Sequence, residues 1–331
     1  MNGLHMLSRT AQGLYWMSRY IERAENIARL LDTGRRMDAL PSTADDRASE
    51  WASIVIASGC ESTYPHDLEE ATAETVADHL VFDRENPSSI ASSFHAAREN
   101  ARAMRIAVTT EVWDAINLTW SQMRAMDTGA IRGGRFAPFL DWVKDRGFLI
   151  RGAAAASMLR DQGYGFIELG KHIERFDATA RLLDVKYHVL LPSAEDVGGG
   201  LDHMQWVQLL RAANSLRAFR WQYRETVTPN GVVHFLVLNE ANPRSLCHTV
   251  RQIEANLEGL THALPAQQAC LAAARQLGDQ VHGRSVEDII AVGLHEWLTQ
   301  RIIDVNCIAL GIADAYGFNG QIPDTLQVQE A

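Results

Sequence analysis

RYIERAENIARLLD, from Arg19 to Asp32, decides the fold, because KHIERFDATARLLD, from Lys171 to Asp184, repeats it without a gap. Around the first stretch, apolar residues recur at steps of three and four, at Leu14, Met17, Ile21, Ala24, Ala28 and Leu31. That spacing lines one face of an α-helix. Each stretch is therefore predicted to be an amphipathic helix. Thr33-Gly34 is predicted to end the first one, since glycine commonly follows the last helical residue.

A second pair of segments repeats in the same order. LVFDRENPSSI (Leu80 to Ile90) matches LVLNEANPRSL (Leu236 to Leu246), and a four-residue insertion reconciles the two spacings. Ordered repeats of this length indicate duplication of one helical unit. We predict an all-α fold of two tandem pseudo-repeated helical bundle units packed together in one compact unit. The first repeat covers residues 1–162 and the second covers 163–331.

Other signals refine the helix boundaries. Asn86 is predicted to cap a helix that begins at Pro87 and runs to Val108, since asparagine is a preferred N-cap and proline suits the first turn. The segment from Val232 to Leu238 resembles a strand, but Thr228-Pro229 before it indicates a helix start, and we predict helix. Residues 129–135 and 196–200 are predicted to be flexible connections.

Composition excludes several classes of protein. The 331-residue chain carries a formal net charge of −10, whereas a nucleic-acid binder needs a concentrated basic surface. No secretory signal and no apolar run long enough to cross a bilayer is found, so we predict no membrane partner. The four cysteines form no C-x-x-C pair, which predicts reduced, buried thiols and a cytoplasmic location.

The repeated helix carries the first candidate site. Glu22, Glu25, Arg29 and Asp32 fall in one polar sector beside the apolar stripe, and the second copy places Glu174, Asp177, Arg181 and Asp184 in the same sector. Two interpretations stay open. Glu25 and Arg29 form a favourable i,i+4 ion pair, which favours a structural role. The carboxylates are also suited to bind an amine or Mg²⁺. No histidine accompanies them at zinc-ligand spacing, and no metal site is predicted.

A second candidate is the arginine stripe, which we define as Arg98, Arg102 and Arg105. These arginines recur at steps of four and three and share one helical face. They are suited either to salt bridges with the acidic sector or to an anion site between helices. In the second copy Glu254 and Glu258 stand at the matching positions, so such an anion site would belong to the first copy alone.

The aromatic residues of the first helix and the absence of known catalytic motifs narrow the range of possible functions. Tyr15, Trp16 and Tyr20 are predicted to pack in the core or between the copies, with an exposed partner surface as the alternative. Phosphate-binding loops, dinucleotide-binding fingerprints and nucleophile elbows are absent from the sequence. No catalytic residue can therefore be named from a motif.

Several segments resemble one family. MLSRTAQGLYWMSRYIERAENIARLLD (Met6 to Asp32) is similar to the opening of the alpha-E domain family, a bacterial all-helical family named for an E-R pair. ARENARAMR (Ala97 to Arg105), EVWDAIN (Glu111 to Asn117) and ANPRS (Ala241 to Ser245) resemble later family segments. The E-R pair carries over to Glu22-Arg23 and, in the second copy, to Glu174-Arg175.

The resemblance implies a function, because members of this family typically occur beside a circularly permuted ATP-grasp ligase, a transglutaminase-like protease and sometimes a proteasome-like peptidase. We expect a binding or accessory subunit that acts with an ATP-grasp amide ligase in small-peptide synthesis or in protein or peptide modification. The transglutaminase-like protease is a second expected partner, and a homodimer is a further alternative. No cofactor of its own is predicted, so Mg²⁺ or a nucleotide would enter only through a partner.

The alternative is an enzyme of amide-bond or acyl-transfer chemistry. Its site would lie between helices and would combine two groups of side chains in one cleft. The groups are Glu22, Glu25 and Arg29 from the repeated helix and Arg98, Arg102 and Arg105 from the arginine stripe.

Overall fold

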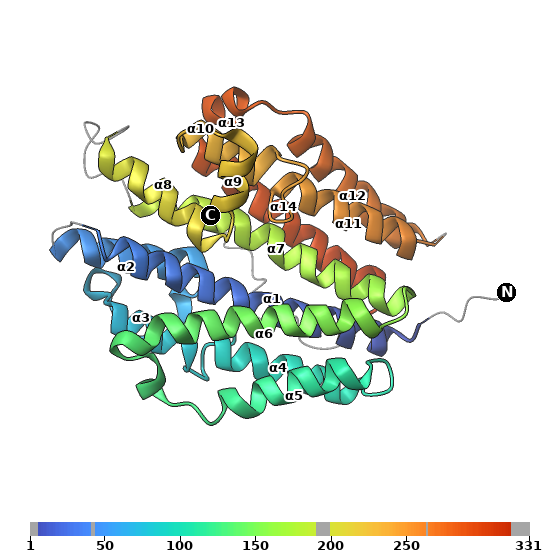
Figure 1. Cartoon of the computed structure of the whole chain (residues 1–331). Helices are drawn as coiled ribbons and strands as arrows, with labels where there is room; N and C mark the ends of the chain where they lie inside the picture. The colour runs from blue at the N-terminus through green and yellow to red at the C-terminus, as the bar shows by residue number, and fades with distance from the viewer. Residues whose placement is uncertain (1–5, 41–43, 190–198, 263, 319–331) are drawn as a thin grey trace.

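Two long helices, α1 (Ser8–Met37) and α7 (Gln162–Val189), pack against each other at the centre of the molecule (Figure 1). The computed structural model describes residues 6–40, 44–189, 199–262 and 264–318. The predicted apolar stripe of α1 is buried throughout. Gly170 of α7 lies so close to α1 that a Cβ atom there would sit 2.4 Å from the carbonyl oxygen of Tyr15. The close approach of the two backbones therefore requires glycine at this position.

Each central helix belongs to a bundle of four. The first bundle consists of α1, α4 (Ile90–Ala103), α5 (Thr110–Met123) and α6 (Phe136–Ser157). The second bundle consists of α7, α11 (Leu246–Leu260), α12 (Pro265–His282) and α14 (Leu294–Ala315). The described residues contain no strand, and the all-α prediction is confirmed. The helices follow the same order and neighbours in both bundles, as a duplication would give, and the duplication itself stays a prediction.

Shorter elements interlock the bundles. The helix α2 (Ala44–Ser58) follows α1 but packs mainly on α7, and α8 (Gly200–Ala212) follows α7 but packs mainly on α1. The remaining helices are α3 (Ala73–Val81), α9 (Leu216–Tyr223), α10 (Pro229–Val233) and α13 (Val286–Val292). Short 3₁₀ turns lie at η1 (Glu61–Thr63), η2 (Leu68–Glu70), η3 (Thr128–Ile131) and η4 (Gly133–Arg135). Because α2 and α8 each reach the other central helix, contacts between the halves extend well beyond α1 and α7.

Three predicted boundaries are wrong. The helix α1 does not end at Gly34 but continues to Met37, and Gly34 instead makes room for Trp51, to which a Cβ atom would come within 2.8 Å. The cap of α4 is Ser89 and not Asn86, whose side chain accepts a hydrogen bond from the Ser88 amide in a turn. Finally, α4 ends at Ala103 and not at residue 108, because the chain turns there to start α5.

The structure also bears on the predicted helix at Val232 to Leu238 and on the two predicted connections. The segment from Val232 to Leu238 is helical, as predicted, and contains the end of α10 and a π-helical turn (His234–Leu238). Thr228 caps α10 by accepting a hydrogen bond from the Gly231 amide at 3.2 Å. The predicted connection at 129–135 contains η3 and η4. Of the other one, residues 196–198 lie outside the described residues, and Gly200 begins α8.

The core confirms most of the buried positions. Tyr15 and Trp16 are buried and Tyr20 is partly buried, which supports core packing over an exposed aromatic surface at the start of α1. Cys60, Cys247 and Cys270 are buried, but Cys307 is exposed, so the prediction of a buried thiol is wrong there. No helix in the described part of the chain has both the length and the apolar character needed to cross a membrane.

Candidate functional site

The two E-R pairs exchange partners between α1 and α7. Arg175 of α7 binds the Glu22 carboxylate through two hydrogen bonds, of 2.7 Å from Nε and 2.9 Å from Nη2. Conversely, Arg23 of α1 binds the Glu174 carboxylate through bonds of 2.6 and 3.0 Å, and Arg19 adds another at 2.9 Å. These bidentate pairs are buried and hold the central helices in one register. Each pair therefore serves the packing of the bundles.

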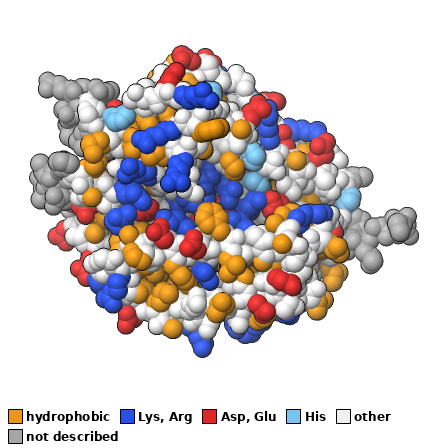
Figure 2. Space-filling model, in the orientation of Figure 1, with side chains coloured by type: hydrophobic (Ala, Val, Ile, Leu, Met, Phe, Trp, Pro, Cys, Tyr) orange, Lys and Arg blue, Asp and Glu red, His pale blue; other side chains and the backbone are white. Residues whose placement is uncertain are grey.

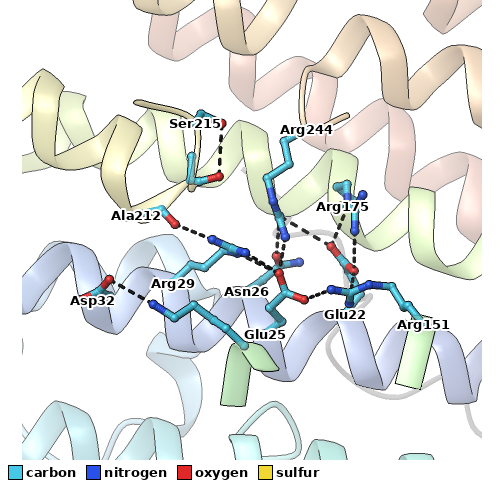
Figure 3. Close-up of polar contacts among 12 residues, drawn as sticks. Glu22, Glu25, Asn26, Arg29, Asp32, Arg151, Arg175, Ala212, Ser215 and Arg244 are labelled. Carbon is cyan, nitrogen blue, oxygen red and sulfur yellow. Dashed lines mark hydrogen bonds and ion pairs between the residues drawn. The ribbon is translucent and has the colours of Figure 1, made fainter. Parts of the chain in front are cut away.

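Glu25 is the centre of a larger network on one face of α1 (Figure 3). Arg29 donates to Glu25 at 3.0 and 2.6 Å, which confirms the predicted i,i+4 ion pair. Arg151 of α6 binds both Glu25 and Glu22. Arg244, which lies just before α11, binds Glu25 and reaches Asn26 at 3.3 Å. Three segments far apart in the sequence thus meet at one carboxylate.

Local structure explains how these arginines are positioned. Asn242 accepts a hydrogen bond from the Arg244 amide at 3.2 Å, and Ser245 caps α11, so the turn fixes the direction of the arginine. Asn86 and Ser89 build the same turn before α4, where Ser88 stands in place of Arg244. On α6, Gly147 leaves room for the Glu25 carboxylate, because a Cβ atom there would lie 2.6 Å from it.

The charges in this network do not balance. We define the Glu22–Glu25 cluster as these two carboxylates and the four guanidinium groups that bind them, from Arg29, Arg151, Arg175 and Arg244. The carboxylates are completely buried, whereas the side chains of Arg151, Arg175 and Arg244 are 19, 10 and 13% exposed. The cluster therefore carries two more positive than negative charges, and its cations lie nearer to the solvent.

The pKa shifts follow from this imbalance. Burial opposes the ionisation of Glu25, but Arg244, Arg29 and Arg151 together lower its pKa to about 2. The pKa of Glu22 is also well below its ordinary value, because Arg175, Arg151 and Arg244 outweigh its burial. Burial and the neighbouring Arg29 lower the pKa of Arg244 to about 9. The carboxylates are thus stabilised as anions, while Arg244 is a cation in unfavourable surroundings.

The arginine stripe does not join this cluster. Arg98 donates to Asn117 of α5 at 2.9 Å and to Glu99 at 2.7 Å. Arg102 is mostly exposed and lies 3.5 Å from Glu99, while Arg105 donates to the carbonyl of Val108. Every contact found for these arginines within the described part of the chain goes to α4, α5 or the turn between them. The single cleft that the enzyme alternative required is not formed.

The candidate residues of the second copy also form two separate groups. Glu174 and Arg175 take part in the exchange between α1 and α7. Asp177 and Arg181 form an i,i+4 pair at 2.7 Å, and Asn306 of α14 donates to Asp177 at 3.1 Å. This pair repeats the geometry of Glu25 and Arg29 but recruits no additional arginine among the described residues. The face that carries Glu25 thus gathers four arginines on two carboxylates, whereas Asp177 is paired with one.

Sequence reasoning missed Arg151 and Arg244. Arg151 lies outside every repeated segment, so no pattern identified it. Arg244 had a signal, because the aligned repeats place it opposite Ser88 in otherwise similar NPSS and NPRS turns. A substitution of serine by arginine at a matched buried turn indicates divergence between the two copies.

Catalytic and metal chemistry find little support elsewhere. The described residues hold no group of three or more His, Cys, Asp and Glu side chains placed to bind a metal. Cys247 Sγ lies 3.1 Å from His282 Nδ1, a contact that resembles a nucleophile and its base. However, Cys247 is buried, and burial raises the pKa of its thiol. The contact therefore lacks an accessible, activated thiolate.

The fold and the cluster define a class of all-helical protein whose two central helices each carry an E-R pair. The chain belongs to the Alpha-E family, described as a predicted alpha-helical domain with a conserved ER motif, whose model matches residues 6–316. Uncharacterized proteins of Mycobacterium bovis and of two Mycobacterium tuberculosis strains are 25% identical over 333 residues. The match covers 92% of this chain but only 36% of each relative. No solved structure matches the chain.

Proposed function

We propose that the chain is a helical accessory subunit that acts with an ATP-grasp amide ligase in small-peptide synthesis or in protein or peptide modification. The observation that carries the proposal is an exposed basic and aromatic face on α9. Trp221 is 80% exposed there, and Arg217, Arg220 and Arg224 lie at helical spacing on the same side of α9. We define this α9 face as Arg217, Arg220 and Trp221 of α9 together with Arg224 at its C-cap.

The α9 face has the chemistry of a protein-binding surface. Its three arginines are exposed, and no carboxylate of the described residues pairs with them. An open hollow of about 710 Å³ adjoins the face, lined by Arg220 and Arg224 together with His203 and residues 225–228. Tryptophan and arginine are enriched among the residues that contribute most to protein interfaces. In a chain of net charge −10 the face is a local basic area, which fits an acidic surface on a partner.

The relatives and the central site support an accessory role. The chain spans about a third of the length of the mycobacterial relatives it matches, so those proteins carry this helical unit joined to a longer polypeptide. The charged groups at the centre bind each other, and the described residues show no activated nucleophile. A unit of this kind is suited to bind and position another protein or its substrate.

Co-purification tests the proposal. The tagged chain is expressed together with an ATP-grasp ligase and a transglutaminase-like protease from the same organism, and we expect it to recover the ligase. Trp221→Ala combined with Arg217→Glu is expected to reduce recovery at least tenfold. Ile106→Ala combined with Arg102→Glu, on an exposed part of the first bundle, is the matched control and is expected to retain it. Failure of the unaltered chain to recover the ligase, or equal recovery by both variants, would contradict the proposal.

A further inference from the structure

We propose that the Glu22–Glu25 cluster is a binding site for a small oxyanion that carries about two negative charges, such as a dicarboxylate or a phosphate monoester. This site lies at the centre of the molecule and is separate from the residues of the α9 face. Figure 2 shows Lys and Arg side chains gathered in a hollow in the middle of this side of the molecule, between the two bundles.

The first argument is charge. Four guanidinium groups bind two carboxylates, and the surplus of two positive charges lies where each cation is at most 19% exposed. Burial of a charge without a counter-ion is costly. Neighbouring groups do not remove the surplus, because Lys171 pairs with Glu168, and Asp32 is shared by Lys144, Arg35 and Arg36. A bound dianion would neutralise the cluster.

The second argument is geometry. The guanidinium groups of the cluster lie around the carboxylates of Glu22 and Glu25 and approach them from different directions (Figure 3). The Nε of Arg151 and the Nη1 of Arg175 find no acceptor among the described residues, and the side chains of these arginines are 19% and 10% exposed. These N–H groups therefore retain the capacity to donate to a bound oxyanion. Guanidinium groups bind carboxylate and phosphate oxygens with particular strength.

The third argument is the position of Arg244. Without it, Glu25 would still bind Arg29 and Arg151, and Glu22 would still bind Arg175 and Arg151. Arg244 is thus not needed to neutralise either carboxylate, and it lies beside two other arginines. Beside it, Asn26 Nδ2 has no hydrogen-bond partner. The cleft of about 10 Å³ lined by Asn26, Arg29 and Arg244 holds at most one water molecule, so the oxyanion would lie outside it, at the more exposed arginines of the cluster.

Titration calorimetry with the full chain tests the site. The probes are glutarate and inorganic phosphate at pH 7.5, with acetate as the singly charged comparison. We expect glutarate or phosphate to bind at least tenfold more tightly than acetate. The probe that binds more tightly shows whether the ligand is a dicarboxylate or a phosphate monoester. Arg244→Gln is expected to weaken that binding at least tenfold. Arg102→Gln, an exposed arginine on α4, is the matched control and should bind like the unaltered chain.

Thermal unfolding without ligand separates a binding role from a structural one. If Arg244 is retained for a ligand, Arg244→Gln unfolds at the same temperature as the unaltered chain or at a higher one. A purely structural arginine would lower the unfolding temperature when it is replaced. The proposal is overturned if neither dianion binds at millimolar concentration, if acetate binds equally well, or if Arg244→Gln binds normally or unfolds at a lower temperature. Because no partner protein is used, failure here leaves the proposed ligase interaction untouched.

Discussion

Glu25→Gln is the perturbation that tests the central network most directly. The substitution keeps the size of the side chain but removes the charge that binds Arg29, Arg151 and Arg244. The fall in the pKa of Glu25 from 4.5 to about 2 corresponds to about 3 kcal/mol of stability at neutral pH, at about 1.4 kcal/mol for each pH unit. Removal of one partner from a buried ion pair typically costs about 3–5 kcal/mol, which agrees.

Urea unfolding measures this loss. With a slope of about 3 kcal/mol per M for a chain of this size, Glu25→Gln lowers the midpoint at pH 7 by about 1 M. The matched control is Asp177→Asn, at the corresponding position of the second repeated helix. Asp177 binds one partly exposed arginine, and we expect its replacement to cost less than about 1 kcal/mol.

The pH dependence gives a second test of the same substitution. Because the folded-state pKa of Glu25 is lowered, its stabilisation is fully present above the unfolded value of 4.5 and is lost as the pH falls toward about 2. The unaltered chain and Glu25→Gln should therefore differ most at neutral pH and converge in acid. The reasoning is refuted if the two midpoints agree at pH 7, if Asp177→Asn costs as much, or if the difference does not shrink in acid.

Three further substitutions or reagents test other parts of the fold. Gly170→Ala should lower the thermal unfolding temperature, since its Cβ atom would collide with the backbone of Tyr15, whereas Gly152→Ala, which meets no atom within 4 Å, should not. A thiol reagent should modify Cys307 rapidly and the three buried cysteines only on unfolding, and mass spectrometry of the labelled peptides checks this order. Thr72→Ala removes the capping box of α3 and should lower the free energy of unfolding by about 1 kcal/mol in urea, and an unchanged midpoint would contradict this role.

Helix periodicity was the most reliable signal in the sequence. The apolar stripe of α1 and the ion pair of Glu25 with Arg29 follow from positions three and four residues apart, so local spacing was enough to predict them. Gly34 shows the limit of such signals. A glycine near the end of a helix indicates a C-cap, but here its function is to admit Trp51 from α2. No local rule distinguishes these two uses of glycine.

The site was harder to predict than the fold because its members come from distant segments. Periodicity placed Glu22 and Glu25 on one face of α1, but it could not indicate that Arg151 and Arg244 approach that face. The same limit explains the arginine stripe. Arg98 and Arg102 share a face of α4, as predicted, but Arg105 lies in the turn after the helix, so that part of the prediction is wrong. The shared face points toward α5 and solvent, since α4 uses its other side to pack on α1. Which face a helix turns toward a given neighbour depends on tertiary packing.

The contrast between Arg244 and Ser88 identifies the face of the molecule on which a ligand site would form. Both residues lie in the same asparagine–proline turn before a serine-capped helix, so the turn itself does not require arginine. The exchange of Glu22 with Arg175 and of Glu174 with Arg23 joins the bundles without Arg244. Packing does not require Arg244, which lies beside other arginines in a turn that carries Ser88 in the first copy. Such an unfavourably placed cation is expected where ligand binding is more important than stability. The proposed ligand site therefore lies on the side of α1 that meets α6 and the turn before α11.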